Sequence, residues 1–294
     1  MRRMKKTKRM KKMLFSFPAL FSFSSVASLP LLFRRRKGHG VHSPFIYNLI
    51  TKVIEEKSPY YIFDEIENFR KKIIAENTEW SKITVREIPS PNYGKFLFRM
   101  AHFFKYRNMI QIGGSTGIMS LYLALASDTE SQCYVLEERP GLLSAIDDFV
   151  LAHHLKRLHL MEGAYEENLK SLSAFLSQEV DFLFIHSLPD GMTWEKLYAL
   201  CEPLIRKTGT IVLHPIRKNQ EMRKGWHFLQ NLSQARVTMD LYDVGVVFFD
   251  NKLPKRHYNA YFNHGKKQNL YTNGRRRLYF VGRRKKSSKN RSAN

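Results

Sequence analysis

Cysteine is scarce in this 294-residue sequence, and no second long uncharged segment accompanies the one near its N-terminus. The missing second segment excludes a polytopic membrane protein, while a hydrophobic content of 43% excludes a disordered or fibrous chain. The two cysteines, Cys133 and Cys201, each lie in an apolar segment. We therefore expect both to pack as small hydrophobic side chains in a reducing, cytoplasmic location, rather than to form a disulfide or a metal site.

Acidic residues are absent from both ends of the chain, and the net charge of +23 belongs to these ends. Residues 1–37 contain 12 Lys and Arg and residues 263–294 contain 11, whereas residues 38–262 contain 26 basic and 26 acidic residues. A basic, nucleic-acid-binding body is thereby excluded. The C-terminal tail has the charge to bind nucleic-acid phosphates or an anionic membrane surface, and a disordered, solubilising tail is the alternative.

Residues 13–33 form the uncharged segment near the N-terminus, with basic residues on both sides. Their layout resembles a signal peptide, and 21 helical residues would barely span a bilayer. Five Ser and two Pro within the segment weaken a helix. We interpret residues 1–37 first as a basic leader or the product of an upstream start site, second as a membrane-associated segment of a cytoplasmic protein, and last as an export signal.

Residues 38–107 predict a group of accessory helices. Apolar residues at three-to-four spacing favour helices over 44–54, 64–76 and 93–104. Ser43 is the expected cap of the first helix, because its side chain can accept a hydrogen bond from the first turn. These helices precede every segment that has the composition of a strand.

Residues 108–262 predict one α/β domain. Five short β-rich segments alternate with helical ones, and they begin at NMIQIG, CYVLE, LHLME, DFLFIHS and TIVLH. Near-continuous apolar strands of this kind predict a parallel sheet that is covered on both faces. The last two strands, 235–243 and 244–250, are joined by a tight turn and predict an antiparallel hairpin. The predicted fold class is therefore a Rossmann-like, doubly wound sheet of five parallel strands closed by a hairpin.

The first strand–helix turn of this sheet is rich in glycine, and such turns usually contact the ligand of a doubly wound fold. It reads QIGGSTG over residues 111–117. A dinucleotide fingerprint needs glycine two and five positions after Gly113, where this chain has serine and isoleucine, so pyrophosphate binding is disfavoured. An acid at the end of the next strand, Glu137 or its neighbour Glu138, can accept both hydroxyls of a ribose. The alternative is an ordinary tight turn beside a solvated acid.

Several of these segments resemble one enzyme family. QIGGSTGIMSLYLA, CYVLEERP, VDFLFIHS and the closing hairpin resemble the class I S-adenosylmethionine-dependent methyltransferases, nearest the small-molecule O-methyltransferases related to catechol O-methyltransferase. The resemblance, over residues 40–262, implies S-adenosylmethionine as cofactor. It places residues 113–117 at the methionine part, Glu137 at the ribose and residues 162–165 at the adenine. The implied cofactor-binding residues are Gln111, Gly113, Gly114, Ser115, Gly117, Glu137, Gly163 and Ala164.

This sequence departs from the family at three functional positions. The family usually has an acid where this chain has Gln111. Its metal-dependent members have an acid after the fourth strand and an Asp-Asn pair after the fifth, where this chain has His186 and His214-Pro215. Mg²⁺ prefers oxygen ligands, so we expect no metal. The base lysine of the catechol enzyme has no counterpart, which leaves His186 as the candidate base; a satisfied polar residue at a strand end is the alternative.

These patterns favour a metal-independent, S-adenosylmethionine-dependent methyltransferase that acts on an oxygen or nitrogen of a small-molecule acceptor. The alternative is a non-catalytic relative that binds a partner or a membrane through its basic tails. Loss of the acid at position 111 favours this alternative, whereas the glycines and Glu137 favour the enzyme. The sequence does not name the acceptor or fix the oligomeric state, and a homodimer is one assembly that it allows.

Overall fold

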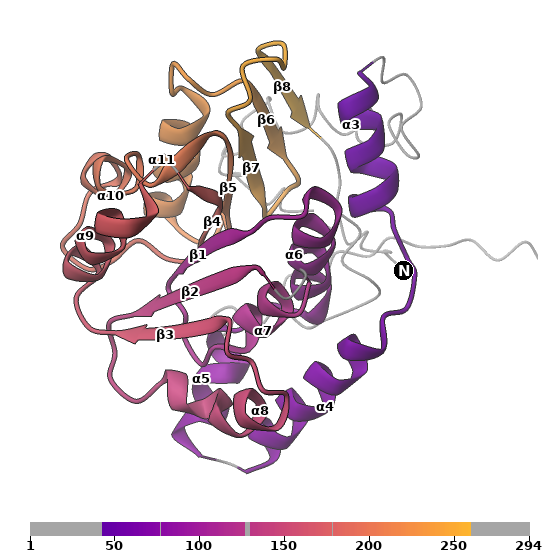
Figure 1. Cartoon of the computed structure of the whole chain (residues 1–294), viewed down its shortest axis with the longest axis vertical. Helices are drawn as coiled ribbons and strands as arrows, with labels where there is room; N and C mark the ends of the chain where they lie inside the picture. The colour runs from indigo at the N-terminus through magenta and orange to yellow at the C-terminus, as the bar shows by residue number, and fades with distance from the viewer. Residues whose placement is uncertain (1–42, 77, 127–129, 178, 260–294) are drawn as a thin grey trace, which may run out of the picture.

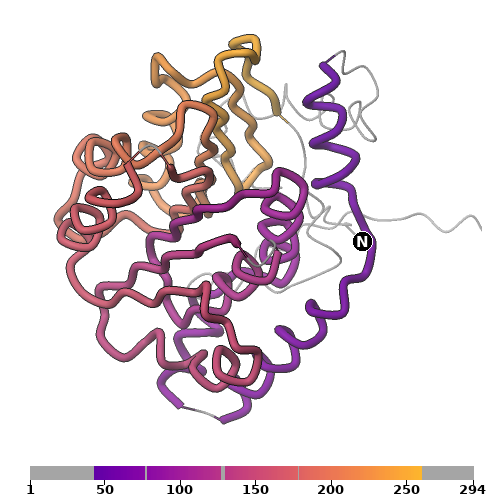
Figure 2. Tube along the Cα trace, in the orientation of Figure 1, coloured from indigo at the N-terminus to yellow at the C-terminus, as the bar shows by residue number. Residues whose placement is uncertain are grey.

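The computed structural model describes residues 43–76, 78–126, 130–177 and 179–259. At its centre is a twisted sheet of eight strands in the order β3-β2-β1-β4-β5-β7-β6-β8, with helices on both faces (Figures 1 and 2). In the part of the chain that is described, no helix is both long and apolar enough to cross a membrane. The expectations for residues 1–37 and for the tail 263–294 lie outside the described residues.

The sheet has the predicted doubly wound topology. Strands β1 to β5 are mutually parallel, and β1 pairs with β2 on one side and β4 on the other, so the chain reverses its direction of winding there. Strand β7 is antiparallel to β5 and β6, which confirms the closing hairpin. Strand β8, parallel to β6, was not predicted because its sequence RHYN is polar. The strands are β1 (Asn108–Ile112), β2 (Gln132–Glu137), β3 (Leu158–Glu162), β4 (Val180–Ile185), β5 (Ile205–Leu213), β6 (Val237–Asp240), β7 (Gly245–Phe248) and β8 (Arg256–Asn259).

Two hydrophobic clusters sandwich the sheet, one on each face. One cluster joins the leading helices α3 to α8 to one face, and the other joins α9, α10 and α11 to the opposite face (Figure 1). The helices are α3 (Pro44–Leu49), the π-helical turn η2 (Ile50–Ile54), α4 (Tyr61–Ala75), α5 (Glu79–Glu87), α6 (Pro91–Phe104), α7 (Ile118–Ala124), the 3₁₀ turn η3 (Leu143–Ile146), α8 (Asp147–Ala152), α9 (Tyr165–Leu176), α10 (Trp194–Cys201) and α11 (Gln220–Gln230).

Helix α5 is the main element that the sequence did not predict. Thr78 caps it by accepting a hydrogen bond from the backbone N–H of Ser81 at 3.3 Å. Its buried positions Ser81 and Thr84 carry hydroxyl groups, whereas the apolar Val85 is exposed, so the usual apolar pattern of a core-facing helix is broken. This helix matters for function, because its last residue reaches the cavity described below.

Other differences concern the limits of elements. The first predicted helix does begin at the cap Ser43, but it divides into α3 and η2. Strand β5 begins at Ile205, earlier than the predicted β-rich segment TIVLH, which starts at Thr210. The predicted packing of the two thiols is confirmed, since Cys133 and Cys201 are both free and fully buried. Burial raises the pKa of each thiol to about 12, which keeps both protonated and unreactive at neutral pH.

Candidate active site

Three polar side chains converge beside helix α5 because of strand alternation. Successive side chains of a strand point to opposite faces, so Gln111, Glu137 and His186 at the carboxyl ends of β1, β2 and β4 all face the leading helices. All three are buried. The pairing of β1 with both β2 and β4 brings them to neighbouring positions at the point where the topology reverses, which is the usual place for a ligand in this fold class.

The turn after β1 has the conformation that its glycines allow. Gly113 and Gly117 have φ values of +81° and +75°, in the left-handed region that favours glycine. A Cβ atom at Gly117 would lie 2.5 Å from Cδ1 of Ile146, and one at Gly114 would lie 2.6 Å from a methyl group of Val135. Gly114 and Gly117 therefore allow close packing inside the fold, whereas Gly113 and Ser115 line the adjoining cavity.

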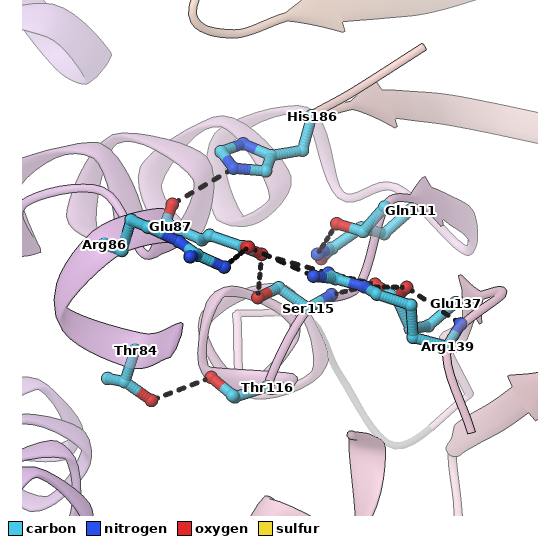
Figure 3. Close-up of polar contacts among 10 residues, drawn as sticks. Thr84, Arg86, Glu87, Gln111, Ser115, Thr116, Glu137, Arg139 and His186 are labelled. Atoms are coloured by element: carbon cyan, nitrogen blue, oxygen red, sulfur yellow. Dashed lines mark hydrogen bonds and ion pairs between the residues drawn. The ribbon is translucent and has the colours of Figure 1, made fainter. Parts of the chain in front are cut away.

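The carboxylate of Glu137 is fully engaged in hydrogen bonds. One oxygen, Oε2, accepts from the backbone N–H of Ser115 at 2.6 Å. Arg139 donates from its Nε to Oε1 at 2.8 Å, from Nη2 to Oε2 at 3.1 Å and from its backbone N–H to Oε1 at 3.2 Å (Figure 3). Glu137 is only 2% exposed. A buried carboxylate needs such partners, because the cost of removing its charge from water is high.

Arg139 also binds a second carboxylate, that of Glu87 at the end of α5. Its Nη1 and Nη2 donate to the two oxygens of Glu87, each at 3.0 Å, and Ser115 Oγ donates to Glu87 Oε2 at 3.0 Å (Figure 3). Burial by itself raises the pKa of Glu87, but hydrogen bonds from Arg139, Arg86 and Ser115 outweigh it and lower this pKa to about 2. The hydrogen bond to Glu137 raises the pKa of Arg139, so the guanidinium stays charged. The three charged groups form one ionic bridge across the site.

His186 is held by the main chain of the same helix end. Its Nε2 lies 3.2 Å from the carbonyl oxygen of Glu87, and since a carbonyl can only accept, Nε2 carries the proton (Figure 3). The other ring nitrogen, Nδ1, is buried and has no hydrogen-bond partner among the described residues. Burial lowers the pKa of His186 to about 4, with a further contribution from the charge of Lys218. The imidazole is therefore neutral at pH 7 and presents an unused acceptor atom.

Gln111 also keeps one acceptor unused. Its Nε2 donates to the carbonyl oxygen of Gly113 at 3.4 Å, a long hydrogen bond, while its buried Oε1 has no partner among the described residues. A buried polar atom without a partner costs about 1–3 kcal/mol, and Gln111 itself is not among the residues that line the two cavities described below.

The segment expected near an adenine follows β3. Gly163 has a φ of +111° and donates its backbone N–H to the carbonyl oxygen of Glu137 at 3.0 Å, which ties this turn to the end of β2. Ala164 precedes α9 and is exposed. Neither residue lines the cavity, but the next one, Tyr165, is buried and does.

Two adjoining cavities open along this edge of the sheet. The first cavity, of about 230 Å³, is bounded by the ionic bridge of Glu137, Arg139 and Glu87 and by His186. The second, of about 490 Å³, extends over residues 186–192 toward Met222 on α11. They share His186, the segment 187–190 and the exposed Lys218. A ligand in the first cavity would therefore lie next to a second ligand in the other, with His186 between them.

The donor set at the ends of β4 and β5 does not suit Mg²⁺. The rings of His186 and His214 are stacked, with centroids 5.7 Å apart and an angle of 20° between their planes. Within the described ranges, no group of three or more His, Cys, Asp and Glu side chains is arranged to hold a metal ion. Mg²⁺ needs oxygen ligands, and two stacked imidazoles do not supply them.

Sequence reasoning missed Glu87, Arg139 and Lys218. Glu87 belongs to the helix that was not predicted, and Lys218 lies in the loop after β5. Arg139 follows Glu137 by two residues, and such proximity to a candidate ribose acid was a signal that could have been used. Among the residues that were predicted, Gly113, Ser115, Glu137 and His186 line the first cavity.

No protein-family model matches the chain, and no curated protein matches it. Solved structures do match it. A methyltransferase from Geobacter sulfurreducens has a TM-score of 0.51 at 13% identity, over 66% of this chain and 91% of that one. The O-methyltransferase TomG from Streptomyces achromogenes, solved with S-adenosylmethionine, has a TM-score of 0.50 at 12% identity, over 66% and 92%.

This chain has a class I O-methyltransferase-like fold. Identities of 12–13% carry the likeness no further than the fold. Within this methyltransferase-like fold, the glycine turn follows β1 and Glu137 is the last residue of β2. Both lie next to the point where the sheet reverses its winding.

Proposed function

We propose that this protein is an S-adenosylmethionine-dependent methyltransferase that acts on a small-molecule acceptor without a metal ion. The observation that carries the proposal is the buried Glu137 carboxylate beside a glycine turn, with a cavity between them and helix α5. Such a carboxylate can accept both hydroxyls of a ribose, and the bare backbone at Gly113 lets a ligand approach closely. When it is bound, S-adenosylmethionine supplies an electrophilic methyl group.

The residues near the first cavity have groups for each part of such a ligand. Glu137 would hold the ribose, and the turn of residues 113–117 would line the methionine part. The unused Oε1 of Gln111 can accept a hydrogen bond from an ammonium group, although a neutral amide attracts that group less than an acid would. The turn of residues 162–165 would lie at the adenine, with Tyr165 as its wall.

On the acceptor side, His186 is the residue that we propose to contact the nucleophile. Its tautomer is fixed by Glu87, so Nδ1 is the acceptor atom of the ring, and His186 lines the second cavity, where a hydroxyl or amine that reaches this buried atom would donate to it. Since burial lowers the pKa of His186 to about 4, the ring is a weak base, and we propose that it orients the nucleophile more than it removes a proton. Close placement of two reactants supplies much of the acceleration in such a transfer.

Calorimetric titration of S-adenosylmethionine and S-adenosylhomocysteine into the full chain tests the cofactor site. We expect micromolar binding of both ligands that Mg²⁺ does not change. Glu137→Ala should weaken binding about 100-fold or more, because each hydrogen bond to a charged group contributes about 1.5–3 kcal/mol. The comparison variant is Glu138→Ala, which removes the exposed neighbouring acid that also lines the first cavity; an affinity change of less than about threefold would assign the ribose to Glu137 rather than to Glu138.

Transfer itself is tested with S-adenosylmethionine labelled in its methyl group and a panel of small phenols, carboxylic acids and amines. Label should move to a member of the panel, and His186→Ala should slow transfer while leaving cofactor affinity unchanged. Tight cofactor binding with no transfer to any small acceptor would favour a non-catalytic relative. Absence of cofactor binding would reject the proposal.

A further inference from the structure

Arg139 occupies the carboxylate that the proposed function assigns to the ribose. A carboxylate has about four acceptor positions. On Glu137 these are taken by the backbone N–H of Ser115, the backbone N–H of Arg139 and two guanidinium nitrogens of Arg139. Ribose hydroxyls that bind Glu137 must therefore displace some of these donors. The two backbone donors belong to fixed turns, which leaves the guanidinium as the group that can move.

The surroundings of Arg139 allow this displacement. Its side chain is 46% exposed and lines the cavity, so it has room to swing outward. Its two hydrogen bonds to Glu87 keep the guanidinium paired when its bonds to Glu137 break. A charge that keeps one partner throughout avoids the cost of standing alone.

Glu87 connects this exchange to the acceptor side. Its carboxylate holds Arg139 and accepts from Ser115 Oγ, while its carbonyl oxygen accepts from Nε2 of His186 (Figure 3). One residue at the end of α5 thus contacts the guanidinium at the nucleoside side and the imidazole at the acceptor side. If Arg139 gives up its hydrogen bonds to Glu137 and keeps those to Glu87, the change acts on Glu87, which is also the residue that holds His186.

We propose that Arg139 is a latch on the nucleoside site, which competes with the ribose for Glu137 and is left bound to Glu87 alone when the ligand enters. Glu87 is then a positioning residue, which keeps hold of the latch and of His186. The inference rests on the proposed function, because it takes Glu137 as the ribose-binding group. It assigns Arg139 a role opposite to that of an ordinary binding residue. Removal of Arg139 together with one acidic side chain, which leaves the net charge of the site unchanged, strengthens the binding of an adenosine ligand.

Titration calorimetry with S-adenosylhomocysteine on the full chain tests the latch through two variants of opposite expected sign. Glu87→Gln removes the charge that receives Arg139, so Arg139 stays on Glu137 and affinity falls about tenfold. The double variant Arg139→Gln/Glu87→Gln removes the competitor together with one acid, which keeps the net charge, and affinity rises about tenfold. The matched control is Arg86→Gln, which removes another cation that donates to Glu87 at 3.0 Å but does not touch Glu137, and no gain is expected.

Thermal melting of each unliganded variant shows whether it folds, and Arg139→Lys provides a milder version. A single ammonium cannot bind two carboxylates bidentately, so this variant should bind S-adenosylhomocysteine more tightly than the wild type but less tightly than the double variant. The ¹⁵N resonances of the His186 ring give a second readout. Ligand binding should shift them in the wild type, and the shift should shrink in Glu87→Gln.

The outcomes separate the two proposals. Equal or weaker binding by the double variant, with binding retained in the wild type, would overturn the latch and make Arg139 an ordinary structural or ligand contact. Tighter binding by the double variant than by the wild type supports the latch. No binding by the wild type or any variant would reject the proposed function itself, and the latch with it.

Discussion

The two sides of the cavity satisfy their polar groups in different ways. On the nucleoside side, Glu137 and Glu87 are charged and saturated by Arg139 and Ser115, so a ligand must exchange partners to bind. On the acceptor side, His186 is neutral and its buried Nδ1 has no hydrogen-bond partner among the described residues, so a donor that binds there breaks no existing hydrogen bond. The comparison teaches that the same edge of a sheet can hold one group whose acceptors are all occupied and one group whose acceptor has no partner.

Packing behind the glycine turn should make the nucleoside side sensitive to single methyl groups. Gly117 and Gly141 have nearly equal φ values, +75° and +73°, but a Cβ at Gly117 would meet Ile146, whereas one at Gly141 would meet nothing within 4 Å. We expect Gly141→Ala to cost about 1–2 kcal/mol from the left-handed conformation alone. Gly117→Ala should cost about 2–4 kcal/mol, because overpacking adds to it. Urea unfolding of both variants measures the difference, and equal costs would contradict the packing.

On the acceptor side, His186 should make stability depend on pH. The unfolded chain binds a proton on this residue near pH 6.5, and the folded chain only near pH 4, so its contribution is fully present above pH 6.5 and is lost as the pH falls toward 4. Between pH 7 and pH 5 this amounts to about 2 kcal/mol. Urea unfolding at both values should show a smaller decline in His186→Gln than in the wild type.

Two other groups with shifted pKa values, Glu87 and His159, do not alter the comparison of His186→Gln with the wild type between pH 7 and pH 5. The pKa of Glu87 is lowered to about 2, so the stabilisation from this acid is present throughout pH 5–7 and adds little to the change of stability between these two values. Burial also lowers the pKa of His159, which affects the wild type and the variant alike and cancels in their difference. An identical decline in both proteins would show that the folded chain protonates His186 as readily as the unfolded chain does.

Gln111 lies on β1, between β2, which carries Glu137, and β4, which precedes His186. Replacing it should raise the stability of the free protein and weaken ligand binding. Gln111→Met removes the unused Oε1, so the free energy of unfolding should rise by about 1 kcal/mol, while affinity for S-adenosylhomocysteine falls about fivefold. The matched control is Gln132→Met. Gln132 Oε1 already has a partner, His159 Nε2 at 2.7 Å, so this change should lower stability and leave binding unaltered. A loss of stability in Gln111→Met would show that Oε1 is satisfied in the free protein.

The smallest expected effect concerns Lys218, whose charge contributes to the lowered pKa of His186. Lys218→Met should raise the pKa of His186 toward 6.5, though burial, the larger cause, remains. An NMR titration of the ring measures this change. Lys224→Met, which removes a lysine paired with Glu221 at 2.7 Å, should leave the titration unchanged.

The parts that the sequence predicted are those with a strong local pattern. Alternating apolar strands and helices specified the sheet, and the glycines at 113, 114 and 117 marked the turn that their φ values or close contacts require. The apolar run CYVLE predicted that the next strand ends at Glu137 or its neighbour Glu138, and β2 ends at Glu137. These patterns act over a few residues or along one face, which is why a single sequence carries them.

The parts that it did not predict depend on contacts between distant segments. Glu87 and Arg139 are 52 residues apart and meet only because α5 packs beside the glycine turn. The contact of Thr84 with Thr116, 3.2 Å between hydroxyl oxygens, helps to place that helix, and buried hydroxyl pairs leave no periodic signal. The depressed pKa of His186 likewise follows from burial, which the residue type does not reveal.

A crystal structure of the full chain with S-adenosylhomocysteine tests most directly the central claim that Glu137 is the nucleoside-binding group and that Arg139 yields it to the ligand. Both ribose hydroxyls should lie within hydrogen-bond distance of the Glu137 carboxylate, with the Arg139 guanidinium bound to Glu87 alone. A ligand bound elsewhere, with Arg139 still on Glu137, would contradict the account.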